Sequence, residues 1–282
     1  MLNSRSLIAS LTLGLALFAG TAQAASWEKI NELGVLTVAV YRDYVPFSFK
    51  DGSVTRGIDV DIARAIADRL GLSLALMPFT ADESLEDDLR NMVWKGHYLG
   101  TGTADLMMHV PVDDELAKDN DQVTILGPYY HAKLAVLFDP AQVAAINALT
   151  DLDDILVGVE TDQLADHYLT AVYGGRYRDN VVHYMLPEEA ATALRAREIQ
   201  AFMGPLTHIQ GALGPDVANY KVSYPPLRGL SFDGWDVGVA VKEDNAELAR
   251  RVAEAIQALR ADGTVEKIFA SYHASYRPPE AD

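Results

Sequence analysis

Residues 104–115, "ADLMMHVPVDDE", bring together two methionines, one histidine and a closing run of three acidic residues. A thioether beside an imidazole can bind copper(I), and an imidazole alone can exchange protons or hydrogen-bond a ligand. The sequence has no cysteine, and His109 belongs to no H-x-H or H-x-x-x-H pair. We therefore expect no metal site and no other cofactor, and we expect His109 either to face a ligand or to pack in the core.

The same stretch has the pattern of a strand end followed by a turn. The apolar run "ADLMMHV" predicts a buried strand, and alternation along it places His109 on the face of Met107, with Met108 opposite. Asp113 and Asp114 follow, and they either balance a cationic ligand at the mouth of a cleft or cap the next helix. Capping is the role that we expect for one of them.

Motifs for covalent catalysis and phosphate binding are missing from the sequence. It contains no cysteine nucleophile, no G-x-S-x-G elbow, no H-E-x-x-H pair and no phosphate loop. General acid–base chemistry would be left to His109, Asp113 or His208. We therefore predict that the protein is not an enzyme.

The first 24 residues have the pattern of a secretory signal peptide. Arg5 supplies a short basic region, the apolar run 7–20 is too short to span a bilayer, and "AQA" at 22–24 fits a cleavage site. No later stretch is long and apolar enough to predict a membrane span. We expect a periplasmic protein that is not inserted in the membrane after cleavage.

The acidic balance of the chain limits its partners. The formal net charge is −17, and it becomes −18 once Arg5 leaves with the leader. Such a charge disfavours nucleic acid and anionic lipid and favours cationic or neutral small ligands, although a solvated acidic surface explains it equally well. We expect a small-molecule ligand, no nucleic acid and a monomeric state.

Strand and helix signals alternate along the mature chain and start again after its middle. Apolar β-branched runs predict strands at 35–40, 72–79, 104–110, 155–160, 180–186 and 235–241, and "QVTILGPYYHAKLAVLFD" predicts one or two strands around a Gly-Pro corner. Apolar residues spaced four apart predict helices at 58–71 and 246–263. Two βαβ series predict a two-lobed α/β protein with a ligand cleft at the carboxyl ends of its strands.

Several blocks resemble, in order, the family 3 bacterial solute-binding proteins. They are "GVLTVAVYRDYVPFSFKDGSVTRGIDVDIARAIADRLGL", "PYY", "DLDDILVGVE" and "VGVAVKEDNAELARRVAEAIQALRADGTVEKIFASYH". The resemblance implies the type II periplasmic binding protein fold, with two hinge strands, residues 26–135 plus 231–275 in lobe 1, and residues 136–230 in lobe 2. It also implies closure of the lobes over a small molecule that is delivered to an ABC permease.

The sequence departs from the amino-acid binders of that family at both ends of the ligand. Where the resemblance implies an arginine that grips an α-carboxylate, "DLMMHVPVDDELAKDN" has none, and Asp113 and Asp114 stand in that region. In lobe 2, Thr161 or Asp162 is expected to cap a helix whose amides would otherwise bind an anion. Where an acid would pair with the α-ammonium, the chain offers His208. We therefore expect a small polar or cationic ligand that is not a typical α-amino acid.

An alternative partner follows from Val110-Pro111. Some members of this superfamily carry a Val-Pro here and accompany periplasmic quinoprotein alcohol dehydrogenases, so an accessory role in such a system stays open. Phe47 is expected in the core, and aromatic residues beside it would suit a cation or a flat apolar group. The residues that we expect to line the ligand site are Tyr44, Phe49, His109, Pro111, Asp113, Tyr130, Asp162 and His208.

Overall fold

A computed structural model describes residues 26–98, 100, 102–230 and 234–280. The signal peptide predicted for residues 1–24 lies outside this range. Within the described residues, no helix has both the length and the apolar character needed to cross a membrane.

The first lobe is built around parallel strands that follow one another early in the chain. Its elements are α1 (Trp27–Leu33), β1 (Val35–Tyr41), β2 (Phe49–Asp51), β3 (Val54–Arg56), α2 (Ile58–Leu70), β4 (Ser73–Phe79), α3 (Leu85–Leu89), the π-helical turn η1 (Arg90–Trp94), β5 (Leu106–Pro111) and α4 (Asp114–Asp119). The closing elements β11 (Gly234–Lys242), α8 (Ala246–Ala261) and α9 (Thr264–Ser271) pack into the same core.

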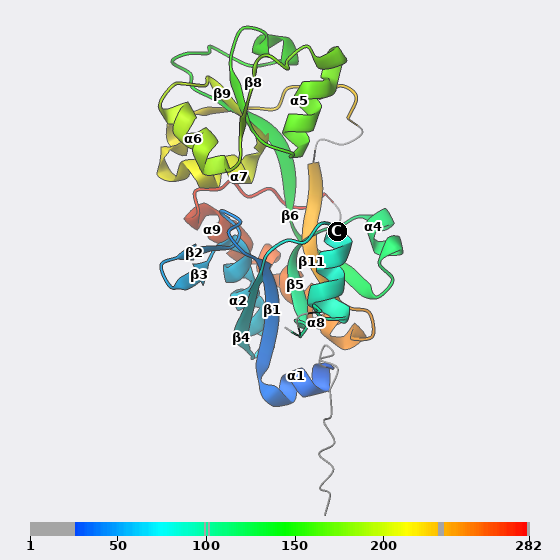
Figure 1. Cartoon of the computed structure of the whole chain (residues 1–282). Coiled ribbons are helices and arrows are strands. Elements are labelled where there is room, and N and C mark those ends of the chain that lie inside the picture. Colours follow the sequence, from blue (N-terminus) through cyan, green and yellow to red (C-terminus); the bar gives the residue numbers. More distant parts are fainter. Residues whose placement is uncertain (1–25, 99, 101, 231–233, 281–282) are drawn as a thin grey trace, which may run out of the picture.

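The second lobe contains the middle of the chain. Its elements are η2 (Leu149–Leu152), β7 (Val157–Glu160), α5 (Leu164–Gly175), β8 (Val181–Tyr184), α6 (Pro187–Arg195), β9 (Ala201–Pro205), α7 (Leu206–Leu213), η3 (Gly214–Asn219) and β10 (Lys221–Ser223). Strand β6 (Val123–Phe138) runs from one lobe into the other (Figure 1). Residues 135/136 and 230/231, the lobe boundaries expected from the resemblance, remain a prediction.

One strand order joins both lobes: β4-β1-β5-β11-β6-β9-β7-β8, with β10 also on β6. The first part of β6 pairs antiparallel with β11, and its last five residues pair antiparallel with β9. Within each lobe the flanking strands are parallel, as in β1 with β4 and β7 with β8. The long strand β6 therefore connects the two lobes and pairs with strands of both.

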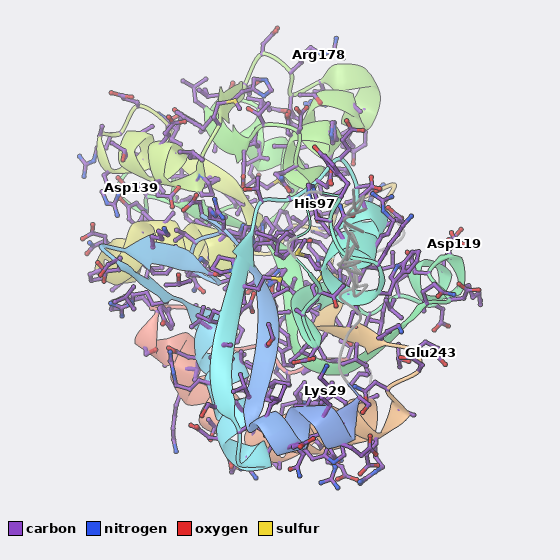
Figure 2. All side chains as sticks on the ribbon, turned by 60° about the horizontal axis from the view of Figure 1, so that its bottom comes forward. Lys29, His97, Asp119, Asp139, Arg178 and Glu243 are labelled. Carbon is purple, nitrogen blue, oxygen red and sulfur yellow. The ribbon has the colours of Figure 1, made fainter. Side chains whose placement is uncertain are left out.

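Apolar clusters fill both faces of the sheet in each lobe. In lobe 1, α2, α8 and α9 cover one face, and η1 covers the other. In lobe 2, α5 packs on one face, and α6 and α7 pack on the other. Charged side chains such as Lys29, Asp119 and Glu243 lie on the outside (Figure 2).

The sequence patterns predicted most of these elements. The strands at β1, β4, β5, β7, β8 and β11 and the helices α2 and α8 are confirmed. The Gly-Pro corner does not break the chain into two strands, because Gly127 adopts φ 61° and β6 continues through a local shift of register. The sequence analysis missed α1, the β2–β3 hairpin and α7, which are short and lack a long apolar repeat.

Gly57 immediately precedes α2 and lies against the backbone of Phe47 and Ser48. Its φ is +139°, and an added Cβ would lie 2.2 Å from the carbonyl oxygen of Phe47. We predict that Gly57→Ala lowers the free energy of unfolding by roughly 3 kcal/mol, because backbone strain and a backbone clash add together. Gly52→Ala is the matched control, since Gly52 has φ +62° and nothing within 4 Å of an added Cβ. It should lose about 1 kcal/mol in urea unfolding, and equal losses would contradict this account.

Candidate ligand site

A β-bulge in β5 sets the direction of His109. Pairing with β11 runs Gly238 to Val110 and then Val239 to Met108, so His109 is the extra residue. Its φ is 64°, in the left-handed region that few residues other than glycine occupy. Bulges of this kind redirect a side chain and often lie beside functional sites.

The bulge overturns the predicted alternation of this strand. Met107 packs in the core beneath η1, and Met108 packs in the opposite core with α2 and α8. His109 contacts Phe47 and Tyr130, so it lies on the face of Met108. The expectation that His109 shares a face with Met107 was therefore wrong, because strict alternation holds only for a regular strand. Among the described residues, no group of three or more His, Cys, Asp or Glu side chains is arranged to hold a metal ion.

Asp59, in the first turn of α2, anchors the imidazole. The carboxylate is 1% exposed, and its Oδ2 lies 3.0 Å from His109 Nδ1. Its Oδ1 accepts a hydrogen bond of 2.6 Å from the Tyr129 hydroxyl. A neutral His109 that donates from Nδ1 presents Nε2 as an acceptor, and the Tyr44 hydroxyl lies 3.4 Å from Nε2. The pair therefore fixes the orientation of a ring that points towards the space between the lobes.

Five rings form what we call the aromatic cluster: Tyr44, Phe47, His109, Tyr130 and His208. Tyr44 meets His109 edge-on, with centroids 4.9 Å apart, and meets His208 in the same way at 4.9 Å. Phe47 lies 4.3 Å from His109 and 5.3 Å from His208. Burial, followed by the negative charges of Asp59 and Glu160, raises the pKa of Tyr44. The hydroxyl of Tyr44 therefore stays protonated and available as a donor.

His208 is the member of the cluster that comes from lobe 2. It lies in α7, on the side of lobe 2 that faces lobe 1 (Figure 1). In the same helix, the backbone at Gly211 approaches Pro46 so closely that an added Cβ would lie 2.6 Å from the proline ring. Gln210 reaches the C-terminal segment, donating to Ser275 Oγ at 2.9 Å and accepting from Ser275 N at 2.7 Å. The structure therefore shows the lobes in direct contact.

A small cavity of lobe 2 lies beside this cluster, at His208. A cavity of about 10 Å³ is lined by Glu160, His208 and neighbouring residues of lobe 2, and it could hold about one water molecule. Burial, and secondarily the charge of Glu188, raises the pKa of Glu160 to about 7. Larger hollows of about 770 and 710 Å³ lie beside α8 and on the outside of lobe 2, and neither is lined by a member of the aromatic cluster.

The predicted site residues separate into two groups. Tyr44, His109, Tyr130 and His208 come together in the aromatic cluster, and Phe47 lies in the core as expected. Phe49 instead packs edge-on against Tyr272, at 6.3 Å, on the α9 side of lobe 1.

The remaining predicted residues occupy turns and a strand end. Pro111 ends β5 opposite Val237, half-buried. Asp113 caps α4 and accepts from the amides of Glu115 and Leu116 at 3.0 and 2.8 Å, so the expected capping role is confirmed.

The expectation of a cap at Thr161 or Asp162 was wrong. Helix α5 begins after Gln163, and Gln163 makes no side-chain capping hydrogen bond. Asp162 is exposed with φ 62°, and its amide donates to Asp166 Oδ2 at 3.0 Å. The carboxylate that accepts a hydrogen bond at this end of α5 is therefore that of Asp166, in the first turn of the helix.

Sequence reasoning missed Asp59, Glu160 and Gln210. Asp59 is the first acid of the "G-x-D-V-D" pattern, which was assigned to the first turn of a helix and not to the site. Glu160 ends the strand "ILVGVE", where the carboxyl ends of strands face the cleft, so its position was a usable signal. Gln210 could not be found in this way, because its partner Ser275 is 65 residues away.

Comparison with known proteins agrees with this architecture. A family described as bacterial extracellular solute-binding proteins, family 3, matches residues 36–275. The chain belongs to this family. The aromatic cluster and the contact between the lobes are therefore features of a family 3 solute-binding protein.

Relatives within the family cover most of the chain. An L-cystine-binding protein of Escherichia coli (strain K12), TcyJ, is 26% identical over 247 residues, or 85% of this chain and 83% of that protein. An L-arginine-binding protein of Pseudomonas aeruginosa is 26% identical over 248 residues, or 83% and 86%. The solved structure of an ancestral cationic amino acid solute-binding protein matches with a TM-score of 0.70 at 23% identity, covering 87% of this chain and 98% of that one. The predicted two-lobed fold is confirmed.

Acid should loosen the closed arrangement through His208. Burial, followed by the electrostatic effect of nearby His109, lowers the pKa of His208 from 6.5 to about 3. An exposed imidazole binds a proton more readily than this buried one, so its contribution to stability is present above pH 6.5 and is lost as pH falls towards 3. We predict that the melting temperature of the wild type falls more steeply over this window than that of His208→Gln. Parallel curves for the two proteins would contradict the assignment.

Proposed function

We propose that the protein captures a small polar or cationic solute between its lobes in the periplasm and presents it to an ABC permease. Membership of the solute-binding family supports the capture of a solute. Two relatives are named for binding L-cystine and L-arginine, and their sequences match 85% and 83% of this chain.

The observation that carries the proposal is the chemical character of those groups. Lobe 1 presents Tyr44 and His109, and the buried carboxylate of Asp59 stands behind them. Lobe 2 presents Glu160 beside His208. Aromatic faces and a carboxylate are the surroundings that a cation prefers.

An α-carboxylate would find a poor partner in the same place. A bidentate guanidinium is the usual group that recognises a carboxylate. Strand β5 and the turn before α4 contain no arginine or lysine, and the nearest cation that follows is Lys118 in α4. Glu160 and Asp59 would repel an anion across a short distance. A solute with a positive or neutral polar group and no free carboxylate therefore fits these residues best.

Entry of the solute requires the lobes to separate. His208 of lobe 2 packs edge-on against Tyr44 of lobe 1, so a solute that enters between these two rings has to part them. In this fold a hinge motion about the crossing strands opens the cleft, and a ligand that touches both lobes then favours closure. Glu160 and Tyr44 come from different lobes, so a solute that contacts both would stabilise the closed state.

A thermal-shift comparison of matched pairs tests the solute class. Each pair is an amino acid and the amine that lacks its carboxylate: arginine and agmatine, lysine and cadaverine, histidine and histamine. We predict that the amine gives the larger rise in melting temperature, because a solute at 100 times its dissociation constant stabilises by about 2.7 kcal/mol. If arginine, lysine or histidine exceeds its amine, the account of the missing carboxylate partner is wrong.

The pH dependence of binding tests the role of Glu160. A cation binds better to the charged carboxylate, and Glu160 in the closed form has a pKa of about 7. Affinity for a cationic solute should therefore rise as pH increases through this value, by up to about tenfold between one unit below and one unit above. Glu160→Gln should remove the rise, measured by calorimetry.

The matched control for that experiment is Glu198→Gln. Glu198 is an exposed carboxylate of the same lobe and lines a different hollow, beside α6. It should keep the wild-type pH profile. A profile that survives in Glu160→Gln, or that disappears equally in both variants, would exclude Glu160 as the partner of the cation.

The alternative of an accessory role beside a quinoprotein dehydrogenase rests on Val110-Pro111. In the structure, Val110 is fully buried in the core under η1, and Pro111 ends β5. Packing and strand termination account for both residues without a dehydrogenase partner. We therefore retain solute capture as the proposed function.

A further inference from the structure

We propose that residues 275–280, which we call the C-terminal strap, hold lobe 2 against lobe 1 and so set the balance between open and closed lobes. The strap follows α9 of lobe 1 and runs between that lobe and α7 towards β11 (Figure 1). The chain itself passes between the lobes in β6 and again between β10 and β11. The strap adds a non-covalent connection to these covalent ones. This inference goes beyond the proposed function and does not depend on the identity of the solute.

The strap begins with a contact to α7 of lobe 2. Gln210 donates from Nε2 to Ser275 Oγ at 2.9 Å, and its Oε1 accepts from Ser275 N at 2.7 Å. Gln210 is 5% exposed, and a buried amide is costly unless its two ends are hydrogen-bonded. The next residue of the strap, Tyr276, packs against Phe269 of α9 in lobe 1, with centroids 5.4 Å apart. Separation of the lobes therefore has to break the contact with Gln210 or the contact with Phe269.

A second contact joins the strap to lobe 2 independently of α7. The Arg277 guanidinium lies over the Tyr224 ring, with Cζ 5.3 Å from the centroid. Tyr224 directly follows β10, which pairs with residues 136–138 of β6 in lobe 2. Two prolines, Pro278 and Pro279, come after Arg277. Their fixed φ angles restrict the unfolded segment as well, so less entropy is lost when the strap is ordered.

The end of the strap is anchored on both crossing strands. Arg277 O accepts from His131 N of β6 at 2.9 Å. Glu280 N donates to the two carboxylate oxygens of Asp236 in β11, at 3.0 and 3.1 Å. His131 lies three residues before Leu134, where β6 changes its partner from β11 to β9. The strap is therefore fixed beside the place where a hinge motion would bend the chain.

Distances between two spin labels test the proposal. The chain has no cysteine, so labels can be placed at Val54→Cys and Met185→Cys, which are 60% and 72% exposed and lie in different lobes. The distances are measured by double electron–electron resonance in two solutions, with and without agmatine. In this background Gln210→Ala should lower the ratio of short to long distances by about fivefold, because it removes the hydrogen bonds to Ser275.

The matched control is Gln200→Ala. Gln200 Oε1 accepts a hydrogen bond of 2.7 Å from Leu156 N, so the bond lies within lobe 2. The same substitution there removes a hydrogen bond of the same kind without touching the strap. It should leave the ratio of short to long distances unchanged.

A second variant keeps the proposal testable if Gln210→Ala does not fold. Arg277 is half-buried, and Arg277→Ala removes its contact with Tyr224. It should lower the ratio of short to long distances by about threefold. Arg251→Ala is its control, because the Arg251 guanidinium lies over the Trp27 ring within lobe 1, with Cζ 4.4 Å from the centroid.

Two results would overturn the proposal. One is a ratio that is the same in the strap variants and in their controls in both solutions. The other is a labelled protein with an intact strap that shows no short distances in either solution. A ratio that falls in the strap variants and does not respond to agmatine would support the strap and would count against agmatine as a solute.

Discussion

Burial of the Asp59 carboxylate is the constraint on which the site depends. A carboxylate that is almost fully removed from water is tolerated only when hydrogen-bond donors replace the water. Tyr129 from β6 and His109 from β5 supply those donors, and α2 supplies the carboxylate. Hydrogen bonds to this one carboxylate thus connect α2, β5 and β6. The contact with Asp59 also fixes the orientation of the His109 ring towards the other lobe.

Irregular backbone is what brings these donors to Asp59. A regular β5 would place His109 on the face of Met107, beneath η1 and away from α2. The bulge at His109 and the register shift of β6 between Leu126 and Tyr130 both lie opposite the same residue of β11, Gly238. An added Cβ at Gly238 would meet the carbonyl oxygen of Leu126 at 2.5 Å, so a glycine allows β6 to pass there. The two irregularities and the buried carboxylate therefore form one local unit.

This explains which features could be predicted from the sequence. The apolar runs of β1 and β4 and the four-residue spacing in α2 and α8 are local signals, and they predicted those elements correctly. The chemical candidates Tyr44, His109 and His208 were also recognisable by type and by position near strand ends. The face of His109 was not predictable, because a bulge depends on the partner strand. Helix α7 and its contact with Pro46 depend on how two lobes meet, and no pattern within eight residues encodes that meeting.

The contact between the lobes also coincides with shifted pKa values of the side chains beside it. Burial drives both titratable groups beside it towards neutrality, lowering the pKa of His208 and raising the pKa of Glu160. A cationic solute would change this balance, because its charge would favour ionised Glu160 in the same low-dielectric surroundings. The same burial would make a charged solute's interaction with Glu160 stronger than it would be in water.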